Sequence, residues 1–169
     1  MDSGTGSAQV RQTCERAVAG EGMVVDTVSL TSAGKRRLVR VTVARDVATL
    51  AEGDHSSVVE PLTLDEVAHA SRCVNDALDS SDVMGASAYT LEVSSPGVGS
   101  PLLTPQSFRR NVGRLLEVSH GEGVVTQDRL VAAGPQGIQL GSTEQDEIPY
   151  DTIDRAVVQV EFSRPTTGE

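Results

Sequence analysis

Aromatic side chains are scarce in this 169-residue sequence. Tryptophan is absent, and the only phenylalanines and tyrosines are Tyr89, Tyr150, Phe108 and Phe162. Proteins that bind single-stranded nucleic acid without sequence preference stack the bases on aromatic side chains. Four rings, far apart in the chain, therefore argue against a base-stacking surface.

Basic residues are also few compared with acidic ones. The chain has one lysine and thirteen arginines against 24 acidic residues, which gives a formal net charge of −10. Residues 1–97 carry 8 basic and 14 acidic side chains, and residues 98–169 carry 6 and 10. Non-specific binding of nucleic acid depends on neutralising phosphates, so this composition disfavours it. A basic protein is the better-matched partner, because complementary potentials speed encounter and contribute specificity.

Cysteines and long apolar runs are few or missing as well. Cys14 and Cys73 are the only cysteines, which is neither a disulfide framework nor a zinc-binding pattern. No run approaches the roughly 18 apolar residues of a membrane span, and the first residues lack the features of a secretory signal. We expect a cytoplasmic protein with reduced thiols, no cofactor or metal, and no membrane association.

The first half of the chain has the pattern of a small α+β domain. Apolar spacing predicts a helix from Ser7 to Ala19, and a capping box formed by Thr63 and Glu66 predicts the start of a second. β-Branched segments predict a hairpin and a third strand. We expect the order α-β-β-α-β, with two helices on one face of a three-stranded sheet. The expected segments are helices 7–19 and 63–79, strands 23–30, 36–45 and 88–94, and an acidic loop 46–61.

Lys35, Arg36, Arg37 and Arg40 form the only basic concentration in the first half. Charged side chains often protect the exposed edge of a sheet from pairing with another chain. We favour that interpretation over a contact patch.

The second half predicts a different architecture. Thr104 followed by Pro105 is typical of a helix start, and five short β-segments with glycine-rich turns follow. Such a pattern favours a small all-β barrel behind a short helix. The expected domains are a disordered terminus at 1–6, an N-terminal α/β domain at 7–95, an interdomain elbow at 96–101, a barrel domain at 102–162 and a tail at 163–169.

The segment LEVSSPGVGSPL, residues 91–102, connects the two halves. Pro96 and Gly97 fit the central positions of a type II turn, in which the glycine takes a positive φ. Neither Ser94 nor Ser95 has the flanking glycines of a hydrolase nucleophile, and the glycines match no phosphate-binding loop. His69 and Cys73, four residues apart on the predicted helix, leave a weaker metal-site or Cys-His alternative. We interpret the segment as a fixed bend between domains.

These residues resemble the RimP family of bacterial ribosome maturation factors. YTLEVSSPGVGSPLLTP, residues 89–105, is similar to that family's LEVSSPG signature, and FRRNVG and IPYDTIDRA resemble its downstream motifs. Gly99 and Ser100 stand where the family usually has Asp-Arg. The longer loop 46–61 and the arginine-poor turn HGEG are further departures.

The resemblance implies an N-terminal α/β domain, a C-terminal Sm-like barrel and no catalytic activity or cofactor. It implies a monomer that binds the free small (30S) ribosomal subunit during assembly and helps to place its twelfth protein, a basic partner, with rRNA as a further candidate. We expect the elbow and the following helix to orient the domains and face the ribosome. The residues concerned are Glu92, Ser94, Ser95, Pro96, Gly97, Pro101, Arg109 and Arg110.

Two other functions stay open on the sequence. One is an Sm-like RNA-binding regulator of gene expression after transcription, which the charge and the lack of aromatic residues disfavour. The other is a small hydrolase that uses Cys73 and His69.

Overall fold

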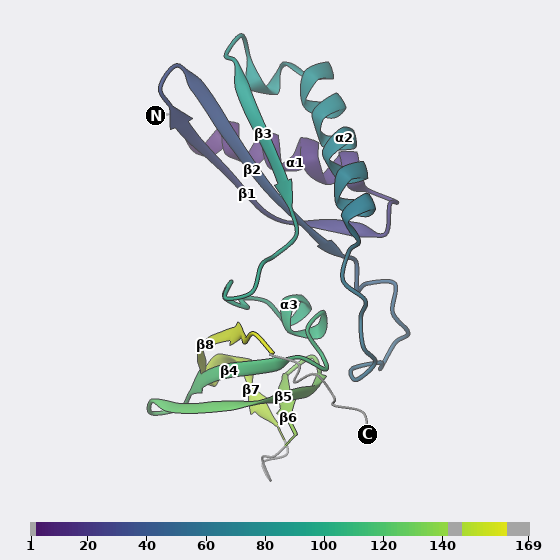
Figure 1. The fold of residues 1–169 in the computed structure, drawn as a ribbon, viewed down its shortest axis with the longest axis vertical. Coiled ribbons are helices and arrows are strands. Elements are labelled where there is room, and N and C mark those ends of the chain that lie inside the picture. The colour runs from purple at the N-terminus through teal and green to yellow at the C-terminus, as the bar shows by residue number, and fades with distance from the viewer. Residues whose placement is uncertain (1–2, 142–146, 162–169) are drawn as a thin grey trace, which may run out of the picture. The chain divides into compact units, whose positions relative to one another are not determined.

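A computed structural model describes residues 3–141 and 147–161 of the chain, shown in Figure 1. The chain divides into two compact units. Unit 1 comprises Met1–Asp46 and Glu60–Pro96, and unit 2 comprises Val47–Val59 and Gly97–Glu169. Among the described residues, no helix is long and apolar enough to span a bilayer.

Unit 1 has the predicted α-β-β-α-β order, with one extra turn of 3₁₀ helix before the last strand. β2 lies in the middle of the sheet, antiparallel to β1 and parallel to β3. The elements are α1 (Ser3–Val18), β1 (Met23–Ala33), β2 (Arg36–Arg45), α2 (Leu64–Ser80), η1 (Asp82–Met84) and β3 (Tyr89–Ser94).

Both helices cover the same face of this sheet (Figure 1). Alternation along β2 places Val39, Val41 and Val43 in a core that is closed by Cys14 of α1 and Val74 of α2. The other face of the sheet, which we call the open face, is covered by neither helix and is mostly polar. Its polar side chains are those of Thr27, Ser29, Thr31, Arg36, Arg40, Thr42, Thr90, Glu92 and Ser94, and its apolar positions are Val24, Ala33, Leu38 and Ala44.

Two details of the helices differ from the predictions. α1 begins at Ser3 rather than Ser7, because the small residues before Ser7 continue the helix without any apolar side chain that periodicity could detect. Residues 1–2, like the predicted tail 163–169, lie outside the described residues. In α2 the predicted capping box is confirmed, but Leu64, which helical spacing predicts on the same face as Val74 and Leu78, is 89% exposed.

The interpretation of the basic cluster as an edge of the sheet is wrong. Arg36, Arg37 and Arg40 lie on β2, which is the central strand, and Lys35 lies in the turn between β1 and β2. A strand that is paired on both sides needs no charged protection against further pairing. These exposed cations therefore require another explanation.

Unit 2 contains a short helix and a five-stranded antiparallel sheet of order β7-β6-β5-β4-β8. Its core includes Leu116, Leu130 and Ile138, together with Phe108 of the helix. In the described residues β7 and β8 end the sheet without pairing with one another, so a closed barrel stays a prediction. The elements are α3 (Pro105–Arg109), β4 (Leu115–His120), β5 (Val124–Ala133), β6 (Gly137–Leu140), β7 (Ile148–Pro149), η2 (Tyr150–Thr152) and β8 (Ile153–Val158).

The segment Val47–Val59 groups with unit 2, although it interrupts unit 1 in the sequence. This differs from the predicted boundaries, which placed it inside the N-terminal domain. Its backbone is held by unit 2: the Ala133 N–H donates to the carbonyl of His55 at 2.9 Å. We call this segment the captured loop.

Candidate functional site

The elbow contains a tight turn, two residues later than predicted. The Ser100 N–H donates to the Gly97 carbonyl at 3.2 Å, and Gly99 has φ of 83°. Gly97 is not among the positive-φ glycines, so the predicted type II turn centred on Pro96 and Gly97 is wrong. Glycine in the third position of a four-residue turn supplies the positive φ, and here that residue is Gly99. Gly99 therefore has a structural role where the resembled family usually has aspartate.

The residues after this turn pack against β8. Pro101 forms a bridge with Val157, and the Leu102 N–H donates to the Ala156 carbonyl at 2.9 Å. These contacts extend the edge of the sheet by two residues and fix the start of α3. At that start, the Thr104 hydroxyl accepts from the Ser107 N–H while the Ser107 hydroxyl accepts from the Thr104 N–H. Thr104 and Ser107 thus form a reciprocal capping box at the N-terminus of the short helix.

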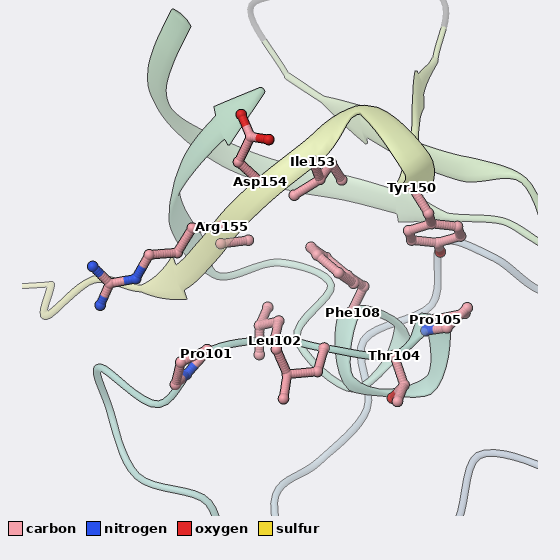
Figure 2. A pocket seen from close by; sticks show the side chains of 11 residues that line it. Pro101, Leu102, Thr104, Pro105, Phe108, Tyr150, Ile153, Asp154 and Arg155 are labelled. Atoms are coloured by element: carbon pink, nitrogen blue, oxygen red, sulfur yellow. The ribbon is translucent and has the colours of Figure 1, made fainter. Parts of the chain in front are cut away.

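A pocket of about 360 Å³ lies between α3 and β8 (Figure 2). Leu102, Phe108, Ile153 and Tyr150 line it, and Leu103 at its rim is 82% exposed. Figure 2 shows the Arg155 guanidinium extending away from these apolar side chains. The pocket suits an apolar side chain of a binding partner, because its lining offers apolar contacts and few converging polar groups. Its complete lining is Pro101, Leu102, Leu103, Thr104, Pro105, Phe108, Tyr150, Ile153, Asp154, Arg155 and Ala156.

Tyr150 has a structural role at this pocket. Its ring packs against Phe108 with the ring centroids 5.4 Å apart, and its hydroxyl donates to the Gly134 carbonyl at 2.7 Å. Burial, together with the nearby charge of Glu147, raises the pKa of Tyr150 to about 12. The hydroxyl therefore stays protonated and donates its hydrogen bond throughout the neutral range.

Arg109 is the most deeply placed charged side chain that the structure describes, with an exposed fraction of 7%. Its guanidinium donates to the Asp54 carbonyl at 2.9 Å, to the Ser57 carbonyl at 2.6 Å and to the Ser57 hydroxyl at 2.7 Å. It also pairs with the Asp54 carboxylate at 3.1 Å. A planar guanidinium with five donors can satisfy several acceptors at once. Arg109 therefore holds the captured loop to α3.

The captured loop is prepared for this contact by its own hydrogen bonds. The Asp54 carboxylate accepts from the Ser57 hydroxyl and from the backbone N–H groups of Ser57 and Ser56. The hydrogen bonds from Ser57, with the Arg109 charge as a smaller cause, hold the pKa of Asp54 below its usual range. The carboxylate is thus ionised where it faces the arginine.

The predicted site residues are distributed over both units. Glu92 and Ser94 lie on the open face of unit 1, where Glu92 forms an ion pair with Arg40 at 2.8 Å. Ser95 and Pro96 follow at the exit of β3, and Gly97 begins the second segment of unit 2. Within unit 2, Pro101 lies at the pocket and Arg110 is half-buried at the end of α3. Arg109 is buried, so its predicted place on a ribosome-facing surface is not supported by its exposure.

His69 and Cys73 come together in unit 1, with an acidic neighbour. The Glu21 carboxylate lies 2.8 Å from His69 Nε2, and Cys73 Sγ lies 3.6 Å from the same nitrogen. A nucleophile-activating histidine uses one nitrogen toward the nucleophile and the other toward its orienting carboxylate. Here both neighbours share Nε2, which is the wrong arrangement for catalysis. In the part of the chain that is described, no three His, Cys, Asp or Glu side chains are grouped as a metal site.

Comparison with known proteins places the chain in a family. The family model described as "RimP N-terminal domain" matches residues 13–99. The protein named "Ribosome maturation factor RimP" from Kineococcus radiotolerans is 37% identical over 162 residues, which cover 86% of this chain and 73% of that protein. The chain belongs to the RimP family.

Other relatives of the RimP family with the same printed name are longer than this chain. The one from a Parafrankia species is 33% identical, with 96% of this chain and 59% of the relative covered. The one from Frankia casuarinae is 34% identical, with 86% and 56% covered. The chain thus spans little more than half the length of these two relatives.

Membership of the RimP family agrees with the LEVSSPG motif, which lies inside the matched residues 13–99. The sequence did not indicate the partners of Arg109, because Asp54 and Ser57 lie 55 and 52 residues away in a loop without periodicity. The one available signal was the run DHSS, since Asp followed by serines favours a local side-chain turn. The pocket was likewise missed, because its lining comes from separated segments.

Proposed function

We propose that this chain is a non-enzymatic maturation factor that binds the free, immature small ribosomal subunit. On this proposal it helps to place the twelfth protein of that subunit. The observation that carries the proposal is membership of a family whose compared relatives are named ribosome maturation factors. The five-stranded sheet of unit 2, with its preceding α3, would be the Sm-like domain that this family membership implies.

The charge of the chain supports a basic partner. The net charge is −10, and complementary potentials accelerate association and exclude wrong partners. The pocket in unit 2 would take an apolar side chain of this partner, with Leu103 as an exposed contact at its rim. A buried apolar anchor surrounded by polar contacts is the usual way in which a small interface gains affinity.

Co-sedimentation tests the proposal directly. The purified protein is mixed with free small subunits, and separately with complete ribosomes, and each mixture is centrifuged through a density gradient. We expect the protein to migrate with the free small subunit and to be absent from the complete ribosome peak. Failure to migrate with free small subunits would contradict the proposal.

A pair of leucine substitutions tests the role of the pocket. Leu103→Glu places a charge at the rim, whereas Leu64→Glu places the same charge on an equally exposed leucine of α2, 89% exposed, outside the pocket. Affinity for the purified twelfth protein should fall at least about tenfold for Leu103→Glu, which corresponds to about 1.4 kcal/mol. Equal affinities of the two variants would show that the pocket is not the contact.

A further inference from the structure

We propose that the open face of unit 1, together with the basic tip of the β1–β2 hairpin, binds the phosphodiester backbone of double-helical RNA. The basic tip consists of Lys35, Arg36 and Arg37. The inference rests on the proposed function only for the source of the RNA, which would be the immature subunit.

Positive charge in unit 1 is concentrated at this place. Four of the eight cations in residues 1–97 lie between Lys35 and Arg40, and all four are exposed. Across the residues that the structure describes, no ion pair joins the tip side chains to a carboxylate. Adjacent like charges without counter-charges repel each other, so an anionic partner would stabilise the tip.

The position of these cations in the sheet removes the simplest structural explanation. From Arg37 to Thr42, β2 is paired both with β1 and with β3, so Arg37 and Arg40 do not protect a free edge. None of the four cations belongs to the core: Arg36 and Arg40 lie on the open face, and Arg37, although on the same side of β2 as Val39, is exposed. A binding role accounts for both observations.

The rest of the open face has the chemistry that contacts phosphate and sugar. Hydroxyl side chains line it on all three strands, from Thr27 and Ser29 on β1 to Thr42 on β2 and Thr90 on β3. Contacts to nucleic acid backbones come mainly from arginine, lysine, serine and threonine side chains. Among the polar positions named for this face, Glu92 carries the carboxylate, and Arg40 compensates its charge at 2.8 Å.

The same face favours double-helical over single-stranded RNA. None of the open-face positions is aromatic, and Tyr89 packs toward the core. Without rings, unstacked bases have no platform, whereas an RNA double helix is recognised through its shape, phosphates and 2′-hydroxyls. The acidic remainder of the protein repels phosphate, which would direct RNA to this surface.

Salt dependence of duplex RNA binding is the first test. Fluorescence anisotropy measures the affinity of the whole chain for a labelled RNA duplex of arbitrary sequence. For three neutralised phosphates, the affinity should fall about 40-fold between about 50 and 200 mM salt. A single strand of the same length should bind more weakly. Absence of duplex binding at low salt, or equal binding of the single strand, would overturn the inference.

A charge-matched pair of triple variants locates the contact. Lys35→Ala, Arg36→Ala and Arg37→Ala are combined in the tip variant, and Arg16→Ala, Arg72→Ala and Arg114→Ala in the control. All six residues are exposed, and both variants change the net charge by the same amount. We expect the tip variant to bind duplex RNA at least about tenfold more weakly than the control and to lose most of the salt dependence. If both triple variants unfold at the same temperature as the unmodified protein and bind duplex RNA with equal affinity, the inference is overturned.

Gradients with free small subunits separate this inference from the proposed function. If the unmodified protein co-sediments but binds no duplex RNA, the inference fails while the proposed function stands. If it binds duplex RNA through the tip but does not co-sediment, the proposed function fails and the inference stands. If the tip variant loses co-sedimentation although the unmodified protein has no duplex affinity, the tip contacts an acidic protein and the inference is overturned.

Discussion

At the scale of single residues, Arg109 joins parts of the chain that are 55 residues apart in sequence. The residue has an exposed fraction of 7%, and its guanidinium donates three hydrogen bonds to oxygens of Asp54 and Ser57. A buried cation is tolerated only when its donors are satisfied. The captured loop supplies those acceptors, so the loop and the arginine stabilise each other.

Arg109→Ala should destabilise unit 2 and release the captured loop. Removal of several charge-assisted hydrogen bonds and the packing of the long side chain should lower the free energy of unfolding by about 2 to 3 kcal/mol. Urea unfolding followed by circular dichroism measures the change. Arg114→Ala, at an exposed arginine of the same unit, is the control and should change stability by less than about 0.5 kcal/mol. Equal effects of the two substitutions would contradict the role assigned to Arg109.

Two glycines of the elbow provide a second residue-scale prediction. Gly99 has φ of 83°, whereas Gly97 has no positive φ and open space around its Cα. Alanine at Gly99 should cost about 1 kcal/mol, because an L-residue is disfavoured in the left-handed region. Alanine at Gly97 should be neutral or slightly stabilising, because it restricts the unfolded chain. Thermal unfolding of both variants decides between this turn and one centred on Gly97.

At the scale of elements, the start of α2 is tied to the end of β2. The Glu66 carboxylate accepts from the Thr63 N–H at 2.7 Å and from the Arg45 guanidinium at 2.7 and 2.9 Å. These hydrogen bonds lower the pKa of Glu66 from 4.5 to about 2, and the one from Arg45 has the largest effect. One carboxylate therefore completes a helix cap and connects the helix to the sheet.

The lowered pKa of Glu66 predicts an acid-sensitive contribution to stability. Because the folded-state pKa lies below the unfolded value, this contribution is present above about pH 4.5 and is lost as the pH falls toward 2. Glu66→Gln should remove that part of the pH dependence, measured as the melting temperature at several pH values. Asp65→Asn, a neighbouring acid of the same first turn, serves as control. An unchanged pH profile for Glu66→Gln would contradict the assignment.

The elements themselves were largely predictable, because each depends on local signals. The apolar spacing in α2 and its capping box, and the alternation of Tyr89, Leu91 and Val93 in β3, are properties of short segments. The position of β2 in the centre of the sheet was not predictable, since it depends on the parallel pairing with β3 about 50 residues later. That pairing changed the interpretation of the basic cluster.

The candidate site was less predictable than the fold for the same reason. The elbow was recognised from its prolines and glycines, but the turn glycine is Gly99 rather than Gly97. Arg109 was named from the sequence as part of a partner-facing surface, but its buried role cannot be deduced from a position at the end of a helix. Its burial depends on the captured loop, whose sequence contains no periodic pattern.

At the scale of the whole molecule, the buried side chains form two separate clusters. One contains residues of α1, α2, η1 and the three-stranded sheet, and the other contains residues of α3 and the five-stranded sheet. The described residues include none that belongs to both clusters. A domain is cooperative because its elements share one core, so two cores imply two cooperative units.

Two separate cores predict that thermal unfolding is not a single two-state transition. Calorimetry should give a calorimetric enthalpy larger than the van't Hoff enthalpy. Leu78→Ala in unit 1 and Leu130→Ala in unit 2, at leucines that are 1% and 0% exposed, should each cost about 3 kcal/mol. Each should lower one melting temperature by about 12 °C or more and leave the other unchanged. A single transition whose melting temperature both substitutions lower equally would mean that the two cores unfold together. The proposed binding surfaces of units 1 and 2 would then have the same free energy of unfolding.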